Sequence, residues 1–198
     1  MPTVGLRERK KEQTRDALAQ AALELFAERG FDQVTVEEIA AACDVSPRTF
    51  FRYFGSKEDV LFADSDRRCD HLLASIAEQD PAVPAFDALA GAVRELAGDY
   101  APEGERLRAR HAILRSTPSL ASRNAERQQG WEGKVIDALR TSGRARGMSD
   151  LDLRLMVAST TTALRVAIED WTASAGEGDL QRRVDAALHY LRVGLGGD

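Results

Sequence analysis

The sequence predicts an all-α fold, and three observations support this prediction. Apolar residues recur three and four positions apart along most of the 198-residue chain, which is the spacing of one helix face. The alternating pattern of a half-buried strand is found nowhere in the sequence. Residues that begin helices (Ser, Thr and Pro) and glycines that end them separate the apolar segments. Hydrophobic residues make up 43% of the chain, enough for one compact domain or two small ones.

The first helix is expected from Lys11 to Arg29. Its apolar residues lie on one stripe, and Gly30 ends it because glycine readily adopts the conformation that terminates a helix. The first 15 residues hold five cations and two acids. Phosphates of a nucleic acid are the partners that such a basic segment would attract.

Residues 35–57, TVEEIAAACDVSPRTFFRYFGSK, predict two short helices joined by a tight turn. Thr35 and Glu38 have the spacing of a capping box, in which each side chain bonds the backbone N–H of the other residue. Ser46 is a suitable N-cap for the second helix, and the proline after it suits the first helical position. Only Cys43–Val45 remain for the turn. This arrangement is that of a helix-turn-helix unit.

The second of these helices has two different faces. Phe50 and Phe54 are four residues apart, so they share one side and can be buried together. The segment from Val45 to Lys57 contains no acid. The other side of the helix suits the DNA major groove, where Arg can pair with guanine, and it carries Arg48, Thr49, Arg52 and Tyr53. The alternative interpretation is an ordinary helical hairpin with a basic solvated face.

The segment VSPRTFFRYFGSKEDVL, after a capped helix, resembles the DNA-binding domain of the TetR family of one-component bacterial regulators. The resemblance covers roughly residues 10–62. Many family members carry a Tyr that touches a phosphate where this chain has Phe51, which is left to press on a sugar or a thymine methyl. Phosphate contacts are then expected mainly from Tyr53, Thr35 and Lys57. The full set of expected DNA-binding residues is Thr35, Arg48, Thr49, Phe51, Arg52, Tyr53 and Lys57.

The resemblance implies two domains. Residues 1–57 are expected to form the helix-turn-helix DNA-binding domain, and residues 58–198 a helical effector-binding and dimerisation domain. A helix capped by Ser56 is expected to continue through Ile76 and to connect them, since no flexible linker interrupts this segment. A movement of the second domain could therefore be transmitted through this helix to the first domain. Further helices are expected after Pro84, Pro102 and Pro118.

The last two expected helices differ in character. One is capped by Ser149 and is apolar or small around much of its circumference, so burial on more than one side is expected. The other, after a glycine-rich break, has a single apolar stripe. Two such helices from each of two subunits would form a four-helix homodimer interface. The expected interface residues are Leu164, Ile168, Val184, Leu188 and Leu191. Alternatively, both helices only complete the core of one chain.

The resemblance also implies a small-molecule effector site within residues 80–175. The candidates are polar or bulky residues on otherwise apolar helices: His111, Trp131, Thr161, Arg165 and Trp171. Each of them could equally have a structural role. The segment VSPRTFFRYF is similar to the sequences of a TetR subgroup that has acyl-CoA-like ligand-binding domains. By analogy, this resemblance implies a lipid-like or acyl-CoA-like effector.

The composition of the chain indicates how its charge is distributed and in which compartment it is expected. The net charge of −5 arises in residues 58–198, because residues 1–57 hold nine cations and nine acids. No apolar segment approaches the roughly 20 residues that span a bilayer. The first 15 residues lack the apolar part of a secretory signal. We therefore expect a cytoplasmic protein with reduced cysteines and no membrane partner.

Chemical motifs are scarce, so the chain is not expected to be an enzyme. The two cysteines and three histidines lack metal-ligand spacing, and neither a metal nor a cofactor is expected. A glycine-rich phosphate loop and a nucleophile elbow are both missing. The expected function is a homodimeric repressor that a small molecule releases from a palindromic operator. The alternative is an architectural or activating DNA-binding protein without ligand-induced release.

Overall fold

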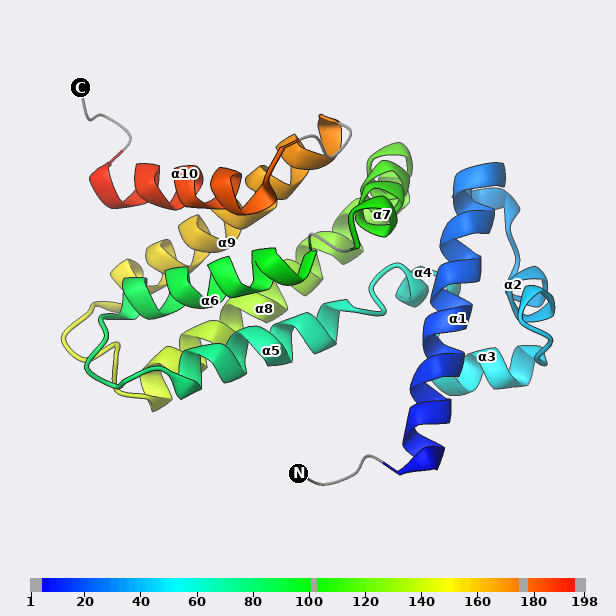
Figure 1. Cartoon of the computed structure of the whole chain (residues 1–198), viewed down its shortest axis with the longest axis horizontal. Helices are drawn as coiled ribbons and strands as arrows, with labels where there is room; N and C mark the ends of the chain where they lie inside the picture. Colours follow the sequence, from blue (N-terminus) through cyan, green and yellow to red (C-terminus); the bar gives the residue numbers. More distant parts are fainter. Residues whose placement is uncertain (1–4, 101–102, 175–177, 195–198) are drawn as a thin grey trace. The chain divides into compact units, whose positions relative to one another are not determined.

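The computed structural model describes residues 5–100, 103–174 and 178–194, without the side chains of residues 6–8. The start of the predicted basic segment lies outside this range. Every regular element in the described residues is a helix (Figure 1), which confirms the all-α class. The chain forms two compact units. Unit 1 holds the residues up to Asp66 together with Ala109–Ala121, and unit 2 holds Arg67–Arg108 and the residues from Ser122 onward.

The compact units thus divide at Asp66 rather than after residue 57, and a later segment joins unit 1. The reason is packing: Ile113 and Leu120 are buried in the same core as Val60 and Phe62. That core also contains Leu18, Phe26, Phe31, Ile39 and Phe50.

The helices of unit 1 follow the sequence signals closely. α1 contacts α2, α4 and the short 3-10 helix η1, and α2 contacts α3. Gly30 ends α1 with a φ of 85°, a conformation that favours glycine. The elements are α1 (Leu6–Arg29), η1 (Phe31–Gln33), α2 (Val36–Ala42), α3 (Pro47–Tyr53) and α4 (Lys57–Val60).

The connecting helix expected from Ser56 through Ile76 is not continuous. Ser56 caps α4 as predicted, but α4 ends at Val60 and α5 (Ser65–Glu78) begins after a turn. In this turn the N–H groups of Leu61, Phe62 and Ala63 bond carbonyls three residues back. The four residues from Val60 to Ala63 are all buried. All four belong to the core of unit 1, so packing as well as hydrogen bonds holds this turn.

Unit 2 is a helical bundle in which α9 contacts both α6 and α10, and α6 also contacts α10 (Figure 1). The Ser149 hydroxyl accepts a bond from the Asp152 N–H at 3.1 Å and caps α9, as predicted. Besides most of α5, the elements are α6 (Ala85–Tyr100), α7 (Gly104–Ser116), α8 (Ala121–Thr141), α9 (Asp150–Ala173) and α10 (Leu180–Val193), with a 3-10 turn η3 (Pro118–Leu120) before α8. The C-terminal part of α7 and all of η3 belong to unit 1.

Candidate nucleic-acid interface

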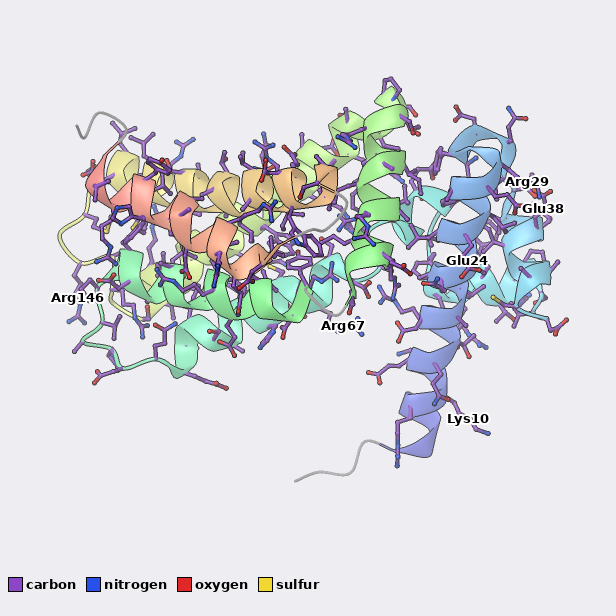
Figure 2. The ribbon with its side chains drawn as sticks, turned by 45° about the horizontal axis from the view of Figure 1, so that its top comes forward. Lys10, Glu24, Arg29, Glu38, Arg67 and Arg146 are labelled. Carbon is purple, nitrogen blue, oxygen red and sulfur yellow. The ribbon has the colours of Figure 1, made fainter. Side chains whose placement is uncertain are left out.

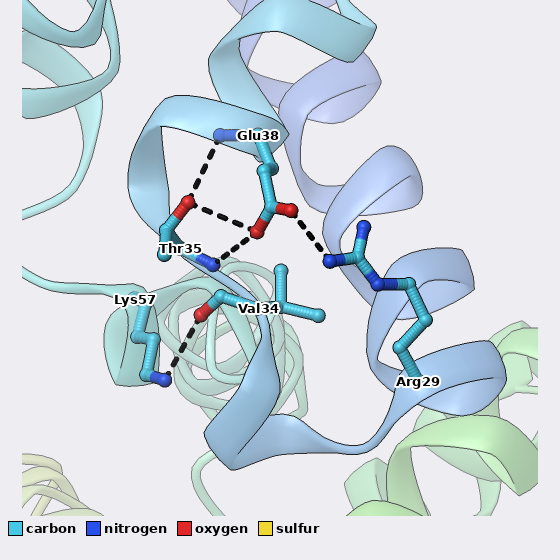
Figure 3. Close-up of polar contacts among 5 residues, drawn as sticks. All are labelled: Arg29, Val34, Thr35, Glu38 and Lys57. Carbon is cyan, nitrogen blue, oxygen red and sulfur yellow. Dashed lines mark hydrogen bonds and ion pairs between the residues drawn. The ribbon is translucent and has the colours of Figure 1, made fainter.

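The N-terminus of α2 is held by a reciprocal capping box. The Thr35 hydroxyl accepts a bond from the Glu38 N–H at 3.3 Å. The Thr35 N–H donates to the Glu38 carboxylate at 2.8 Å, and the Thr35 hydroxyl donates to the same oxygen at 3.0 Å (Figure 3). The Thr35 hydroxyl therefore donates its hydrogen bond to Glu38. The family resemblance had led us to expect a phosphate as its partner.

Glu38 is also paired across helices. The Arg29 guanidinium of α1 lies 2.5 Å from its second carboxylate oxygen, as Figure 3 shows. Both residues are labelled at the same end of unit 1 in Figure 2. The hydrogen bond from Arg29, followed by those from the Thr35 N–H and hydroxyl, lowers the pKa of Glu38 from 4.5 to about 2. The carboxylate is thus ionised at neutral pH, and it links α1 to the beginning of α2.

Lys57 holds the segment before this cap. Its ammonium donates to the carbonyl oxygen of Phe31 at 2.9 Å. It also donates to that of Val34 at 3.0 Å, the bond drawn in Figure 3. It also lies 4.5 Å from the centroid of the Phe31 ring. An ammonium has three donors, so two of them serve the protein itself. Sequence reasoning identified Lys57 but not these carbonyl partners, since a backbone acceptor has no sequence signal.

The turn between α2 and α3 is short and well defined. Asp44 has a φ of 54°, a left-handed conformation that Asp tolerates better than most residues. The Ser46 hydroxyl accepts from the Thr49 N–H at 3.2 Å and lies 3.0 Å from the Thr49 hydroxyl. Ser46 therefore caps α3, as predicted. The Thr49 hydroxyl lies within hydrogen-bond distance of this capping hydroxyl.

The two predicted faces of α3 are confirmed. Phe50 and Phe54 are buried, with ring centroids 5.4 Å apart. Arg48, Phe51 and Arg52 are exposed. At about 100° per residue the two arginines lie opposite the buried pair, and Phe51 lies to one side of them. These three residues form what we call the α3 outer face.

Tyr53 lies at the edge of this face and is half-buried. The Arg52 guanidinium donates to the Tyr53 hydroxyl at 3.1 Å and lies 5.0 Å from its ring centroid. The tyrosine oxygen thus accepts from Arg52, while its own O–H is available as a donor. An exposed cationic face beside a phenol donor has the chemistry that duplex DNA requires.

The residues predicted to bind an effector are divided between the two units. His111 lies in unit 1, whereas Trp131, Thr161, Arg165 and Trp171 lie in unit 2. Arg165 pairs with Glu169 one turn further along α9, at 2.8 Å. The Thr161 hydroxyl lies 3.0 Å from the carboxylate of Glu132 on α8, a partner that sequence reasoning missed. Trp131 is half-buried against the core of unit 2.

Trp171 is a core residue. It is buried, and its indole N–H donates to the Gly178 carbonyl at 3.2 Å. A Cβ at Gly104 would lie only 2.8 Å from Cη2 of this indole. The ring therefore packs directly on the backbone at the start of α7, where the absence of a side chain is required.

Four of the five predicted dimer residues are buried within a single chain. Val184 and Leu188 are 0% and 1% exposed, and Leu164 and Ile168 are also buried; Leu191 is half-buried. Those four side chains belong to the core of unit 2 within one chain, so they offer little surface to a partner chain. The same two helices carry other, exposed apolar residues instead: Leu151, Leu155 and Val166 on α9, and Tyr190 and Val193 on α10.

Other kinds of site find little support in the part of the chain that the structure describes. No group of three or more His, Cys, Asp or Glu residues there could hold a metal ion. None of the described helices has the length and apolar character needed to cross a membrane. Burial raises the pKa of the Cys43 thiol, with Asp44 as a second cause, which disfavours the reactive thiolate.

Comparisons with known proteins agree with this geometry. Residues 18–63 match the family model described as bacterial regulatory proteins of the tetR family, and residues 83–196 match that of the MftR C-terminal domain. The regulator TcmR of Streptomyces glaucescens is 33% identical, over 98% of this chain and 89% of its own. MftR of Mycobacterium tuberculosis, named as a regulator of mycofactocin biosynthesis, is 32% identical over 94% and 93%.

Solved structures have the same fold. The fatty acid degradation regulator FadR of Bacillus halodurans has a TM-score of 0.66 at 23% identity, covering 93% of this chain and 97% of its own. FadR of Thermus thermophilus, a transcriptional repressor solved with lauroyl-CoA, has a TM-score of 0.60 at 25% identity, covering 93% and 96%. The relatives are named as transcriptional regulators and not as enzymes. The chain therefore belongs to the TetR family of bacterial transcriptional regulators, with a C-terminal domain of the MftR type.

Proposed function

We propose that this chain is a homodimeric repressor that binds a palindromic operator through α2 and α3 and leaves it when a small molecule binds unit 2. The observation that carries the proposal is the α3 outer face. Arg48, Phe51 and Arg52 stand exposed over a buried aromatic base, and the segment from Val45 to Lys57 contains no acid. Such a face fits the polar, anionic major groove.

Roles within the interface follow from the contacts. Arg48 and Arg52 are the candidates for base contacts, because Arg can bond two acceptors of a guanine. Tyr53 and Thr49 have hydroxyls at the edge of the same face and suit phosphate oxygens. Thr35 and Lys57 are engaged with the protein itself. They serve DNA binding by holding the N-terminus of α2, which revises the phosphate role expected from sequence.

DNA binding is tested with the duplex immediately upstream of the chain's own gene. We expect protection of an inverted repeat by the full-length protein. Arg48→Ala should weaken operator binding by about 1–3 kcal/mol and leave affinity for random DNA nearly unchanged. Equal loss on both DNAs would show that Arg48 contacts only phosphates. Lys134→Ala, an exposed cation of unit 2, is the matched control.

For the effector we propose an acyl-CoA or a similar lipid thioester. The support is the lauroyl-CoA complex of the Thermus thermophilus repressor, whose fold this chain shares. The chain has two tryptophans, and both lie in unit 2, so tryptophan fluorescence, excited where tyrosine does not absorb, reports on that unit alone. Lauroyl-CoA should change this fluorescence and release operator DNA, whereas free coenzyme A should do neither. If lauroyl-CoA does neither, the effector class is wrong.

The same titration separates the proposal from its alternative. Linkage requires operator DNA to weaken effector binding by the factor by which the effector weakens DNA binding. A coupling of about 1–3 kcal/mol is typical of such systems. Lauroyl-CoA affinity that is the same with and without operator would favour an architectural or activating protein without ligand-induced release.

The dimer is proposed to form through the outward faces of α9 and α10. Leu155 and Val166 on α9 and Tyr190 on α10 are exposed, and the two helices contact each other. Single exposed apolar residues are common, but several on one pair of helices are typical of an interface. A two-fold axis through such a pair joins four helices.

A further inference from the structure

Phe51 differs from every other apolar side chain around it. Among the described side chains of unit 1, it is the one large apolar group that is mostly exposed, at 54%. It lies one turn of α3 from both Arg48 and Phe54, so it stands at the edge of the α3 outer face that is nearer to the buried pair. More than half of this aromatic ring's surface is left in water by its own chain, which suggests that a ligand covers it.

The Phe51 ring has a rigid support. The ring of Phe50 lies beneath it, with centroids 5.5 Å apart and planes at 87°. Phe50 itself is 0% exposed and packs on Phe54. The neighbouring guanidinium of Arg52 is directed to Tyr53. Phe51 is therefore presented to the outside from a fixed base and is not a loose surface residue.

The chemistry of DNA limits what such a ring can meet. A phosphate pressed against a phenyl group would lose water and gain no hydrogen bond, which is unfavourable. Base edges in the major groove are donors and acceptors, apart from one apolar group, the C5-methyl of thymine. We infer that Phe51 contacts a thymine methyl in each half-site and so contributes to sequence specificity. This inference rests on the proposed function, in which α3 enters the major groove.

The test removes only the methyl group. The operator is first obtained by selecting tight-binding duplexes from a random pool with the full-length protein. Each thymine is then replaced in turn by uracil, which pairs identically but lacks the methyl. For the unaltered protein we expect one thymine per half-site at which uracil lowers affinity about fourfold, the factor for one buried methyl group. With Phe51→Ala, uracil should make no difference at that position.

Phe51→Tyr is the matched control, because it keeps the ring and should keep the sensitivity to uracil. Three outcomes overturn the inference. Uracil has no effect at any position with the unaltered protein, a measurement that needs no variant. Uracil has the same effect with Phe51→Ala as without it. Phe51→Ala weakens binding to operator and random DNA alike, which indicates a sugar contact. A selection that yields no preferred sequence is a different failure, because it overturns the proposed function itself.

Discussion

The ammonium nitrogen of Lys57 lies 3.0 Å from the carbonyl oxygen of Val34, the residue just before the cap of α2. Its second bond reaches the carbonyl of Phe31, so one side chain from α4 holds the segment from Phe31 to Val34. Arg29 and Glu38 hold the same region from the other side, through Thr35. The position of the N-terminus of α2 therefore depends on a cation from α4 and an ion pair from α1.

Lys57→Met should destabilise the chain, because the Val34 carbonyl loses its donor and the Phe31 carbonyl keeps only the long bond from the Val34 N–H. We expect the free energy of unfolding to fall by about 1–3 kcal/mol and operator binding to weaken. The slope of log affinity against log salt should not change, since a positioning residue releases no counterion. Urea unfolding and anisotropy titrations at several salt concentrations measure both quantities. A slope reduced by about one unit per subunit would instead show that the ammonium reaches a phosphate.

Arg52 and Tyr53 should act as one unit in DNA binding. Arg52→Ala removes the guanidinium, and Tyr53→Phe removes only the hydroxyl that accepts its hydrogen bond. In a double-mutant cycle on operator affinity, we expect an interaction energy of about 0.5–3 kcal/mol. Additive effects would mean that the pair separates when DNA binds. Arg48 with Tyr53 provides the control cycle, in which additivity is expected.

Exposed and buried residues of the last two helices should respond differently to a charge. Leu155→Asp combined with Tyr190→Asp places carboxylates on the proposed interface, and we expect a monomer that keeps its helix content and loses operator binding. Leu188→Asp buries an unpaired charge in the core, and we expect unfolding instead. Light scattering and circular dichroism distinguish the two results. A doubly substituted chain that is still dimeric would place the interface elsewhere.

Glu38 should make the free energy of unfolding depend on pH only at acidic pH. Its folded pKa of about 2 lies below the ordinary 4.5, so its ionised network stabilises the folded chain fully above the ordinary value. This stabilisation is lost as the pH falls through the folded value. Glu38→Gln should therefore be less stable than the unaltered chain near neutral pH, and the difference should shrink as the pH falls from about 4.5 to about 2.

The matched control is Glu37→Gln, which changes an exposed carboxylate in the same first turn of α2. It tests whether the effect comes from the Arg29–Glu38–Thr35 network or only from a negative charge near the helix start. Urea unfolding at a series of pH values gives both curves. A stability difference for Glu38→Gln that is the same at all pH values would contradict the assignment.

Local signals made much of the fold predictable. Thr35, Ser46 and Ser149 cap their helices as expected, because a cap is a bond between residues three positions apart. The burial of Phe50 and Phe54 followed from their spacing in the same way. Such features depend on a few neighbouring residues, so sequence periodicity contains them.

Long-range packing was less predictable. The apolar stripe of α10 correctly indicated a buried side, but periodicity cannot tell a chain's own core from a partner's surface; Val184 and Leu188 belong to the former. The break after Val60 was missed because Leu61 and Phe62 continue a helical apolar pattern, and only the core that receives them shows the turn. Lys57 was selected for its charge, whereas its acceptors are backbone carbonyls.

Because Trp171 lies so close to Gly104, the one methyl group that Gly104→Ala adds would displace the indole ring. Alanine favours helices more than glycine does, so any loss of stability in Gly104→Ala must come from the displaced indole, whose nearest atom would lie 2.8 Å away. The substitution adds neither charge nor polarity, and it changes no residue of unit 1. If operator affinity shifts in this variant, the interior of unit 2 communicates with the DNA-binding helices, and that can be learned before any effector has been identified.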